Sequence, residues 1–187
     1  MARTKEFDVD EVVDRAVDLF RSKGHAATSV QDLVDHLGIN RGSIYDTFGN
    51  KEQLYDLALA RYVEQGRSFV DTELGADAPL RDRLERICVA LVDSAQGRGC
   101  FVVNTACERN DLHPSAQAAT AAAFDVTRSQ LREAFRSAAS QRTSTVEPDI
   151  AAEAVLVLMQ GLMVMATTGA DHETLGPVIA ATLDPLV

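Results

Sequence analysis

The stretch from Thr28 to Leu54 constrains the fold of this chain more than any other part of its sequence. It predicts two short helices joined by a tight turn, followed by the start of a third helix. Gly38 supplies the positive φ that ends the first helix, and Asn40 is a good N-cap for the second. Apolar residues at spacings of three and four give the first helix one buried face: Val30, Leu33, Val34 and Leu37.

The helix starts in this stretch carry recognisable caps. Thr28 and Gln31 stand three residues apart, as the two halves of a capping box do, so we expect the first helix to start at Ser29. Asn50 and Gln53 form a second box-like pair. Lys51 would then lie in the first turn of the third helix.

The second helix combines an apolar back with a polar front. Ile44 and Phe48 lie four residues apart and point to the core. The front carries hydrogen-bond donors beside a glycine: Arg41, Gly42, Ser43, Tyr45 and Thr47. A helix of about two turns does not persist alone in water, and such donors suit phosphates and base edges in a major groove. Exposed helix N-termini are further phosphate sites, so the stretch follows helix-turn-helix logic.

The motif T-S-V-x-D-L-x-x-x-L-G-I-N-R-G-S-I-Y-x-x-F-x-N-K-E-x-L resembles the DNA-binding domain of TetR-family transcriptional regulators. The resemblance extends from about Asp8 to Leu59, and the rest of the chain fits the family in length and helical pattern. It implies a dimeric repressor whose helix-turn-helix is released from a palindromic operator on double-stranded DNA by a small-molecule effector in a second domain.

The predicted DNA contacts follow from this placement. Arg41 would read a base, most often guanine, or grip a phosphate, and Gly42 would let the helix backbone approach the groove. Phosphate contacts are expected from Thr28, Ser43, Tyr45, Thr47 and Lys51. Tyr45 has a second interpretation, as a half-buried ring packed on the first helix.

One position departs from the family pattern. Many relatives carry aromatic or histidine side chains where this sequence has Asp46 and Thr47. Asp46 would either accept a hydrogen bond from cytosine N4 or pair with Arg41 and hold it. These two residues therefore affect which operator sequence is recognised, and not whether DNA is bound.

The net charge of −10 argues against non-specific coating of nucleic acid. Salt screening limits the range of each charge's interactions to about 10 Å. A local basic surface is therefore compatible with the negative net charge, and its predicted residues are Arg3, Lys5, Arg41 and Lys51. Arg3 and Lys5 lie in a polar arm, residues 2–6, that would either touch DNA or fray. The polar start and three cysteines predict a cytoplasmic protein. The longest apolar run, Ala154 to Ala166, is shorter than a bilayer requires, so no membrane contact is expected.

Helical periodicity over the whole chain predicts an all-α protein. We expect a helix-turn-helix domain over residues 1–50, a connecting helix over 51–73, and an effector-binding and dimerisation domain over 74–187. The individual helices are expected at Asp8–Lys23, Lys51–Glu73, Leu80–Ala95, Cys100–Asn110, Pro114–Ser140, Pro148–Gly169 and Thr174–Leu186.

The short segment from Cys100 places Cys100, Asn104, Cys107 and Glu108 on one stripe. One interpretation is that they line an effector pocket with apolar neighbours: Ile87, Leu91, Phe124, Met159 and Met163. The other is that the cysteines are core residues, Asn104 caps a neighbouring helix and Glu108 pairs with an arginine.

The segment Pro148–Gly169 is apolar all round beyond its first turns, so it must be buried on several sides. With the last helix it predicts a homodimer through residues 148–187, formed by four helices. A single deep core helix is the alternative.

No cluster supports catalysis or a metal site. The histidines His25, His36, His113 and His172 show no metal-ligand spacing. We therefore expect no cofactor, no metal and no enzyme. Three alternatives remain: a thiol-based electrophile or redox sensor using Cys100 or Cys107, an enzyme, and an activator that binds protein.

Overall fold

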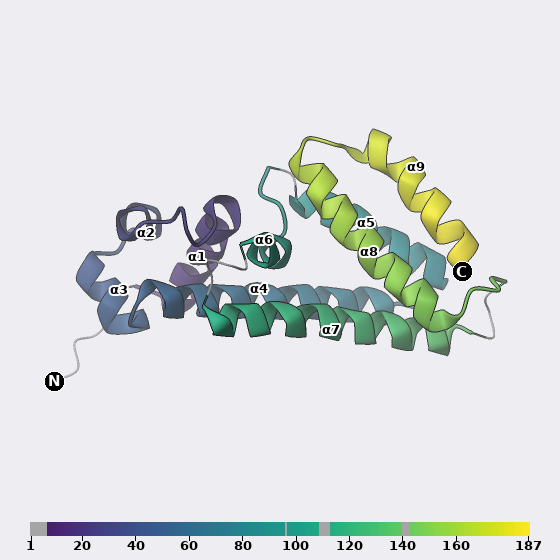
Figure 1. Cartoon of the computed structure of the whole chain (residues 1–187), viewed down its shortest axis with the longest axis horizontal. Coiled ribbons are helices and arrows are strands. Elements are labelled where there is room, and N and C mark those ends of the chain that lie inside the picture. The colour runs from purple at the N-terminus through teal and green to yellow at the C-terminus, as the bar shows by residue number, and fades with distance from the viewer. Residues whose placement is uncertain (1–6, 96, 109–112, 140–142) are drawn as a thin grey trace. The chain divides into compact units, whose positions relative to one another are not determined.

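The computed structural model describes residues 7–95, 97–108, 113–139 and 143–187 (Figure 1). Within these ranges every regular element is helical, which confirms the all-α prediction. The helices are α1 (Val9–Lys23), α2 (Val30–Leu37), α3 (Arg41–Phe48), α4 (Lys51–Leu74), α5 (Leu80–Ala95), α6 (Phe101–Cys107), α7 (Pro114–Ser137), α8 (Pro148–Thr167), α9 (His172–Leu183) and the 3-10 turn η2 (Asp184–Leu186).

The chain divides into two compact units. Unit 1 comprises Met1–Glu64 and Phe101–Thr120, and unit 2 comprises Gln65–Cys100 and Ala121–Val187. Helices α4 and α7 therefore contribute residues to both units. α6 belongs to the unit that contains the helix-turn-helix, whereas the sequence analysis expected it in the effector-binding domain.

Unit 1 is built around fully buried side chains from α1, α2, α3 and α4. Phe20, Leu33, Leu37 and Ile44 are each almost completely buried. α1 packs on α2, α2 on α3, and α1 on α6. Tyr55 of α4 lies at the centre, with its ring edge-on to Phe20 at 4.9 Å and to Phe101 at 5.2 Å between centroids.

The helix ends in unit 1 follow the predicted chemistry with one correction. The capping box of α2 is Ser29 with Asp32, one residue later than the predicted Thr28 and Gln31. The Ser29 side chain accepts from the Asp32 backbone N–H, and the Asp32 carboxylate accepts from the Ser29 backbone N–H. Gly38 ends α2 with a φ of +69°, as expected.

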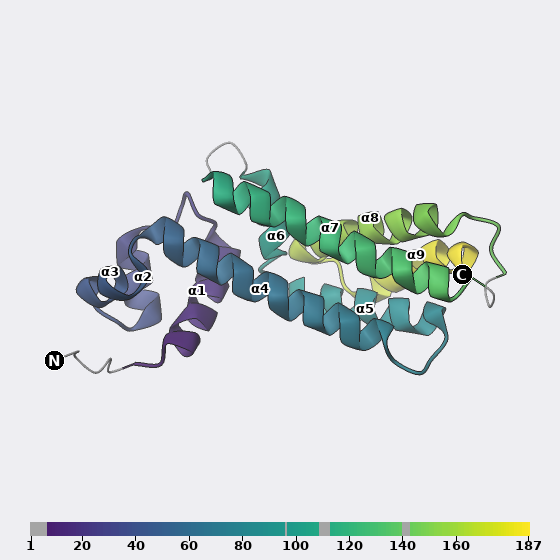
Figure 2. The same ribbon diagram turned by 90° about the horizontal axis from the view of Figure 1, so that it is seen from below.

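Unit 2 consists mainly of α5, α8 and α9, with the C-terminal halves of α4 and α7. α5 packs against both α8 and α9, and α8 against α9. In Figure 1 the ribbon of α8 passes in front of α5, and Figure 2 shows the same helices from below. The core of unit 2 contains the aliphatic side chains of Leu84, Ile87, Val155, Leu162 and Leu183 together with the fully buried ring of Phe135.

The apolar helix α8 has two different faces. One face is buried in unit 2, and the other exposes Ile150, Val157 and Val164, at 64%, 65% and 49%. With 20 residues, α8 is long and apolar enough to cross a membrane by length and composition alone. The sequence-based argument against a membrane span considered only the run from Ala154 to Ala166, and it therefore underestimated the length of this apolar helix. Its packing against α5 and α9 matches a core helix of a helical domain.

The predicted helices extend beyond the observed ones at several ends. α6 ends at Cys107 rather than Asn110, α7 at Ser137 rather than Ser140, and α8 at Thr167 rather than Gly169. Asn110 and Ser140 lie outside the described residues, as does the arm with Arg3 and Lys5.

Candidate nucleic-acid interface

Helix α3 presents its polar side chains outward from a buried back. Ile44 and Phe48 are 1% and 5% exposed. The Asn40 side chain caps the helix by accepting from the Ser43 backbone N–H at 2.9 Å. On the opposite side the side chains of Arg41, Tyr45 and Asp46 are exposed, and those of Ser43 and Thr47 are half-buried. The structure thus forms one two-turn helix with an outward row of polar groups.

Arg41 is oriented by Tyr45. The Arg41 Nη2 atom lies 3.4 Å from the Tyr45 hydroxyl, a long hydrogen bond. The guanidinium carbon lies 5.6 Å from the centroid of the Tyr45 ring, within cation–π range. Tyr45 is 38% exposed, so its ring supports Arg41 on the surface. The described partner of Arg41 is Tyr45, whereas Asp46 was one predicted partner.

Gly42 leaves open space on the outer surface of α3. A Cβ built there would come within 3.2 Å of the Asn40 Oδ1 atom that caps the helix, and it meets no other side chain closely. A methyl group would therefore demand only a small shift of the cap. The absence of a side chain fits a close approach of the helix backbone to another molecule.

Thr28 has an interior role, which corrects its predicted one. Its side chain is 1% exposed, and its hydroxyl donates to the Gly24 carbonyl at 2.5 Å. A buried hydroxyl that is already paired does not reach a phosphate. Thr28 instead fixes the turn between α1 and α2.

The Lys51 ammonium makes two hydrogen bonds inside unit 1 and has a third donor that can bind another molecule. Its Nζ atom donates to the carbonyl oxygens of His25 and Thr28, each at 3.0 Å. An ammonium has three donors, so one remains for an external acceptor. Lys51 therefore ties the start of α4 to the α1–α2 turn and keeps one donor for a phosphate.

Helix α6 holds the same turn from another side. The Asn104 side chain donates to the Arg21 carbonyl in the last turn of α1, at 3.0 Å. The Glu108 carboxylate accepts from the His25 backbone N–H, also at 3.0 Å. Asn104 thus caps a neighbouring helix, as one interpretation expected, and Glu108 binds backbone rather than an arginine. Neither side chain lines the cavity described below, and pocket lining by these two residues stays a prediction.

Further bonds and ring contacts connect α4, α6 and the turn. The Tyr55 hydroxyl and the Thr105 hydroxyl lie 2.9 Å apart in the interior. Burial raises the pKa of Tyr55 to about 12. The His25 ring stands edge-on to Tyr55 at 4.9 Å, and its pKa is lowered by desolvation and then by the Lys51 charge. No sequence pattern predicted this network, because Tyr55 and Thr105 are far apart in the chain.

The remaining predicted pocket residues belong to unit 2, apart from Cys107, which is exposed in unit 1. Ile87, Cys100, Met159 and Met163 are buried, and Leu91 and Phe124 are half-buried. Burial also raises the pKa of the Cys88 thiol to about 12, which makes that cysteine a poor thiolate.

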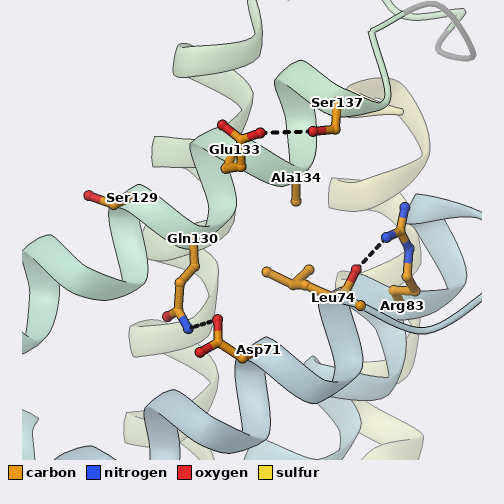
Figure 3. Close-up of a pocket in the computed structure, with 9 residues that line it drawn as sticks. Asp71, Leu74, Arg83, Ser129, Gln130, Glu133, Ala134 and Ser137 are labelled. Atoms are coloured by element: carbon orange, nitrogen blue, oxygen red, sulfur yellow. Dashed lines mark hydrogen bonds between the residues drawn. The ribbon is translucent and has the colours of Figure 1, made fainter.

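Unit 2 contains a cavity of about 480 Å³ that none of the predicted pocket residues lines (Figure 3). Its walls come from the end of α4, the start of α5 and the end of α7: Asp71, Leu74, Gly75, Arg83, Ser129, Gln130, Glu133, Ala134 and Ser137. The sequence contained no marker for it, because these residues show no common motif or spacing. Among the described residues no group of His, Cys, Asp and Glu could hold a metal ion.

Two family profiles match this chain. The profile described as bacterial regulatory proteins of the tetR family matches residues 12–58. The profile described as a tetracyclin repressor-like C-terminal domain matches residues 79–182, more than half of the chain. The chain belongs to the TetR family. It is therefore a DNA-binding transcriptional regulator of the helix-turn-helix type, and the family is one of regulators rather than enzymes.

Individual relatives agree with this assignment. The HTH-type transcriptional regulator YezE of Bacillus subtilis is 35% identical over 139 residues, covering 72% of this chain and 70% of YezE. The HTH-type transcriptional repressor ComR of Escherichia coli is 32% identical over 107 residues, which span 54% of this chain and 51% of ComR. Among solved structures, a cysteine-substituted TetR-family regulator, CifR, in complex with a 26-base-pair operator DNA, superposes with a TM-score of 0.83 at 28% identity, covering 97% of this chain and 98% of CifR.

Proposed function

We propose that this TetR-family protein is a repressor that binds a palindromic operator as a homodimer and leaves it when a small molecule binds. The observation that carries the proposal is α3: a two-turn helix, buried through Ile44 and Phe48, with a row of outward polar side chains. Relatives described as transcriptional repressors and the CifR structure with operator DNA support it. A protein of this kind acts in the compartment that holds genomic DNA.

In this proposal α3 enters the major groove. Arg41, held over the Tyr45 ring, reads a guanine edge, and Gly42 allows close approach. Asp46 is exposed, and its carboxylate can accept from cytosine. Phosphate contacts come from the remaining outward groups: Ser43, Tyr45, Thr47 and the free donor of Lys51.

The homodimer is proposed to form through residues 148–187. Ile150, Val157 and Val164 follow one another at intervals of seven residues along α8, and Met165 and Val178 are about half exposed. A row of exposed apolar side chains along one helix face is typical of a protein interface. A two-fold dimer would present two copies of α3 to half-sites about 34 Å apart, as a palindrome requires.

Release by an effector is proposed to act on the turn between α1 and α2. Asn104 of α6, Glu108 directly after α6 and Lys51 of α4 all bind backbone groups of residues 21–28. A displacement of α6 or α4 would therefore pull on the turn that positions α2 and α3. The effector must favour one conformation over the other to have this effect.

The experiment that tests the proposal starts from a random pool of DNA duplexes selected by the purified protein. Recovery of a two-fold symmetric sequence, bound by a dimer in sedimentation, is the expected result. Arg41→Ala should weaken the preference for the selected sequence by about tenfold or more. Arg136→Ala removes the same charge from an exposed position on α7 in unit 2 and should not. A monomer that selects no common sequence would contradict the proposal.

A further inference from the structure

Helix α4 has a short stretch near its middle that is exposed on every side. The helix spans 24 residues, Lys51–Leu74, and the boundary between units 1 and 2 falls within it, directly after Glu64. The five consecutive residues from Glu64 to Ser68 are all exposed. One helical turn takes 3.6 residues, so these five residues cover the whole circumference. Because tertiary packing supplies most of the stability of a helix in a protein, α4 is weakly supported here.

Gly66 lies at the centre of this exposed stretch. Apart from its chain neighbours and the backbone of the helix itself, no atom of the described residues lies within 4 Å of a Cβ built on Gly66. Its φ is not among the positive values that favour glycine. Neither crowding nor backbone conformation therefore requires a glycine at this position. A glycine inside a helix destabilises it relative to alanine, because the backbone has more freedom to lose.

The parts of α4 on either side of this stretch are anchored by burial. Toward the N-terminus the side chains of Leu54 and Leu59 are completely buried. The Arg61 Nη1 atom donates to the Asp14 carboxylate of α1 at 3.1 Å. Toward the C-terminus Val70 is 4% exposed. The weakly supported stretch thus lies between two parts of the same helix that are each held in place.

Two backbone carbonyl groups directly after Gly66 accept hydrogen bonds from side chains. The Gln130 Nε2 atom of α7 donates to the Arg67 carbonyl at 3.1 Å. The Thr72 hydroxyl donates to the Ser68 carbonyl at 2.8 Å. Bonds of this kind compete with the backbone hydrogen bonds of a helix and often bend it. They add to the weakness that the glycine introduces.

Helix α7 also contributes residues to both units, and it has a similar bond at the boundary. Its last residue in unit 1 is Thr120. The Thr120 side chain is 5% exposed, and its hydroxyl donates to the Ala116 carbonyl at 2.7 Å. Such back-bonding slightly destabilises a helix. Both helices common to the two units therefore carry a bond of the bending type next to the boundary, and α4 has Gly66 as well.

We propose that α4 is jointed at Gly66, and that the joint lets each copy of α3 adjust to its half-site in the operator. The joint rests on features of the free chain, and its use on DNA rests on the proposed function. One added base pair rotates two half-sites by about 35° relative to each other, since a turn of DNA takes about 10 base pairs. Each copy of α3 must then turn by about 17°, which is less than the roughly 20° of a sharp helix kink.

The joint is tested on the free full-length protein by hydrogen exchange of the α4 amides. The backbone hydrogen bonds of amides 66–70 span Gly66. In the wild-type protein these amides should exchange faster than those of residues 55–59, which lie in the buried part of α4. Gly66→Ala should slow their exchange by about fivefold, because alanine favours a helix over glycine by about this factor. The added methyl group enters open space, so this variant is expected to fold.

The matched control moves the glycine along the helix. Gly66→Ala combined with Ala60→Gly keeps the amino-acid composition and places the glycine beside the buried Leu59 and the anchored Arg61. Ala60 is exposed, so its substitution removes little packing. Amides 66–70 should exchange as slowly in this double variant as in Gly66→Ala. Ser68→Gly adds a second glycine to the exposed stretch and should make the same amides exchange faster than in the wild type.

The use of the joint is measured on the selected operator and on a copy with one base pair added at its centre. The loss of affinity caused by the added base pair should be about fivefold larger for Gly66→Ala and for the double variant than for the wild type. It should be smaller for Ser68→Gly. A role of Gly66 in stability alone would leave this ratio of affinities unchanged.

Two results would overturn the proposal. Equal exchange of amides 66–70 in the wild type and in Gly66→Ala would show that α4 has no joint. Slower exchange in Gly66→Ala, together with the same loss of affinity in all four proteins, would show that the joint is not used on DNA. If the pool of duplexes yields no symmetric sequence, the proposed function fails, and hydrogen exchange still decides by itself whether α4 is jointed.

Discussion

The short helices α3 and α6 are similar in sequence pattern and different in structure. α3 has 8 residues and α6 has 7, and each combines polar side chains with a buried apolar face. On α3 the polar groups face outward, and Arg41 contacts only its neighbour Tyr45 among the described polar partners. The Asn104 side chain of α6 binds the backbone in the last turn of α1, and Glu108, directly after α6, binds the His25 backbone N–H in the turn that follows α1.

The difference shows that a polar stripe on a short helix has two possible meanings. Where the polar groups have internal partners, as at α6, they hold the fold together. Where they face outward from a well-anchored helix, as on α3, they are available to another molecule. Substitutions on α3 should therefore change recognition with little change in stability, and substitutions at α6 should do the reverse.

The largest effect is expected for Arg41→Ala. Loss of a bidentate contact to a base costs about 1–3 kcal/mol of discrimination, so the ratio of operator to random-DNA affinity should fall by about tenfold or more. An exposed substitution changes the free energy of unfolding by about 0.5 kcal/mol or less. Fluorescence anisotropy on both DNAs and urea unfolding measure the two quantities. Equal losses on operator and random DNA would refute base reading by Arg41.

Lys51→Ala should combine the two kinds of effect. It removes the proposed phosphate contact, which should weaken binding to operator and random DNA alike. It also leaves the Thr28 carbonyl without its described donor and the His25 carbonyl with the Thr28 backbone N–H alone, so the free energy of unfolding should fall by about 1–2 kcal/mol. Lys51→Arg is the control that keeps a donor. A variant with unchanged stability would show that these two bonds contribute nothing to the turn.

Asn104→Ala tests the other half of the comparison. It leaves the Arg21 carbonyl without the Asn104 donor, and unfolding should become easier by about 1 kcal/mol. The preference for operator over random DNA should stay within about twofold, because no reading side chain is altered. Ala106→Ser, at an exposed position of the same helix, is the control. Urea unfolding and anisotropy again supply both numbers.

The comparison also explains what the sequence could predict. Apolar periodicity and caps located α1 to α5 to within a residue or two, because those signals are local. The Thr28 cap was misplaced because Thr28 and Ser29 are both good N-caps, and only burial decides between them. The partners of Asn104 and Glu108 and the lining of the cavity depend on contacts between distant segments. Periodicity identifies which face of a helix is polar but not what that face meets.

The smallest effect concerns pH and the α1–α2 turn. Desolvation, followed by the Lys51 charge, lowers the pKa of His25 below its ordinary value of 6.5. The unfolded chain then binds more protons than the folded one as pH falls below 6.5, so the stability contribution of neutral His25 is fully present above that pH. It is lost progressively as pH falls from 6.5 toward the folded pKa.

Wild-type protein should therefore lose stability between about pH 7 and pH 5.5 by more than His25→Gln does, since glutamine does not titrate. Thermal unfolding across this pH range measures the difference. The control variant is His36→Gln, which removes an exposed histidine of α2. Identical pH profiles for the two variants would contradict the prediction. In that case protonation of His25 would not destabilise the α1–α2 turn, and the bonds from Lys51, Asn104 and Glu108 to its backbone would be sufficient to hold it.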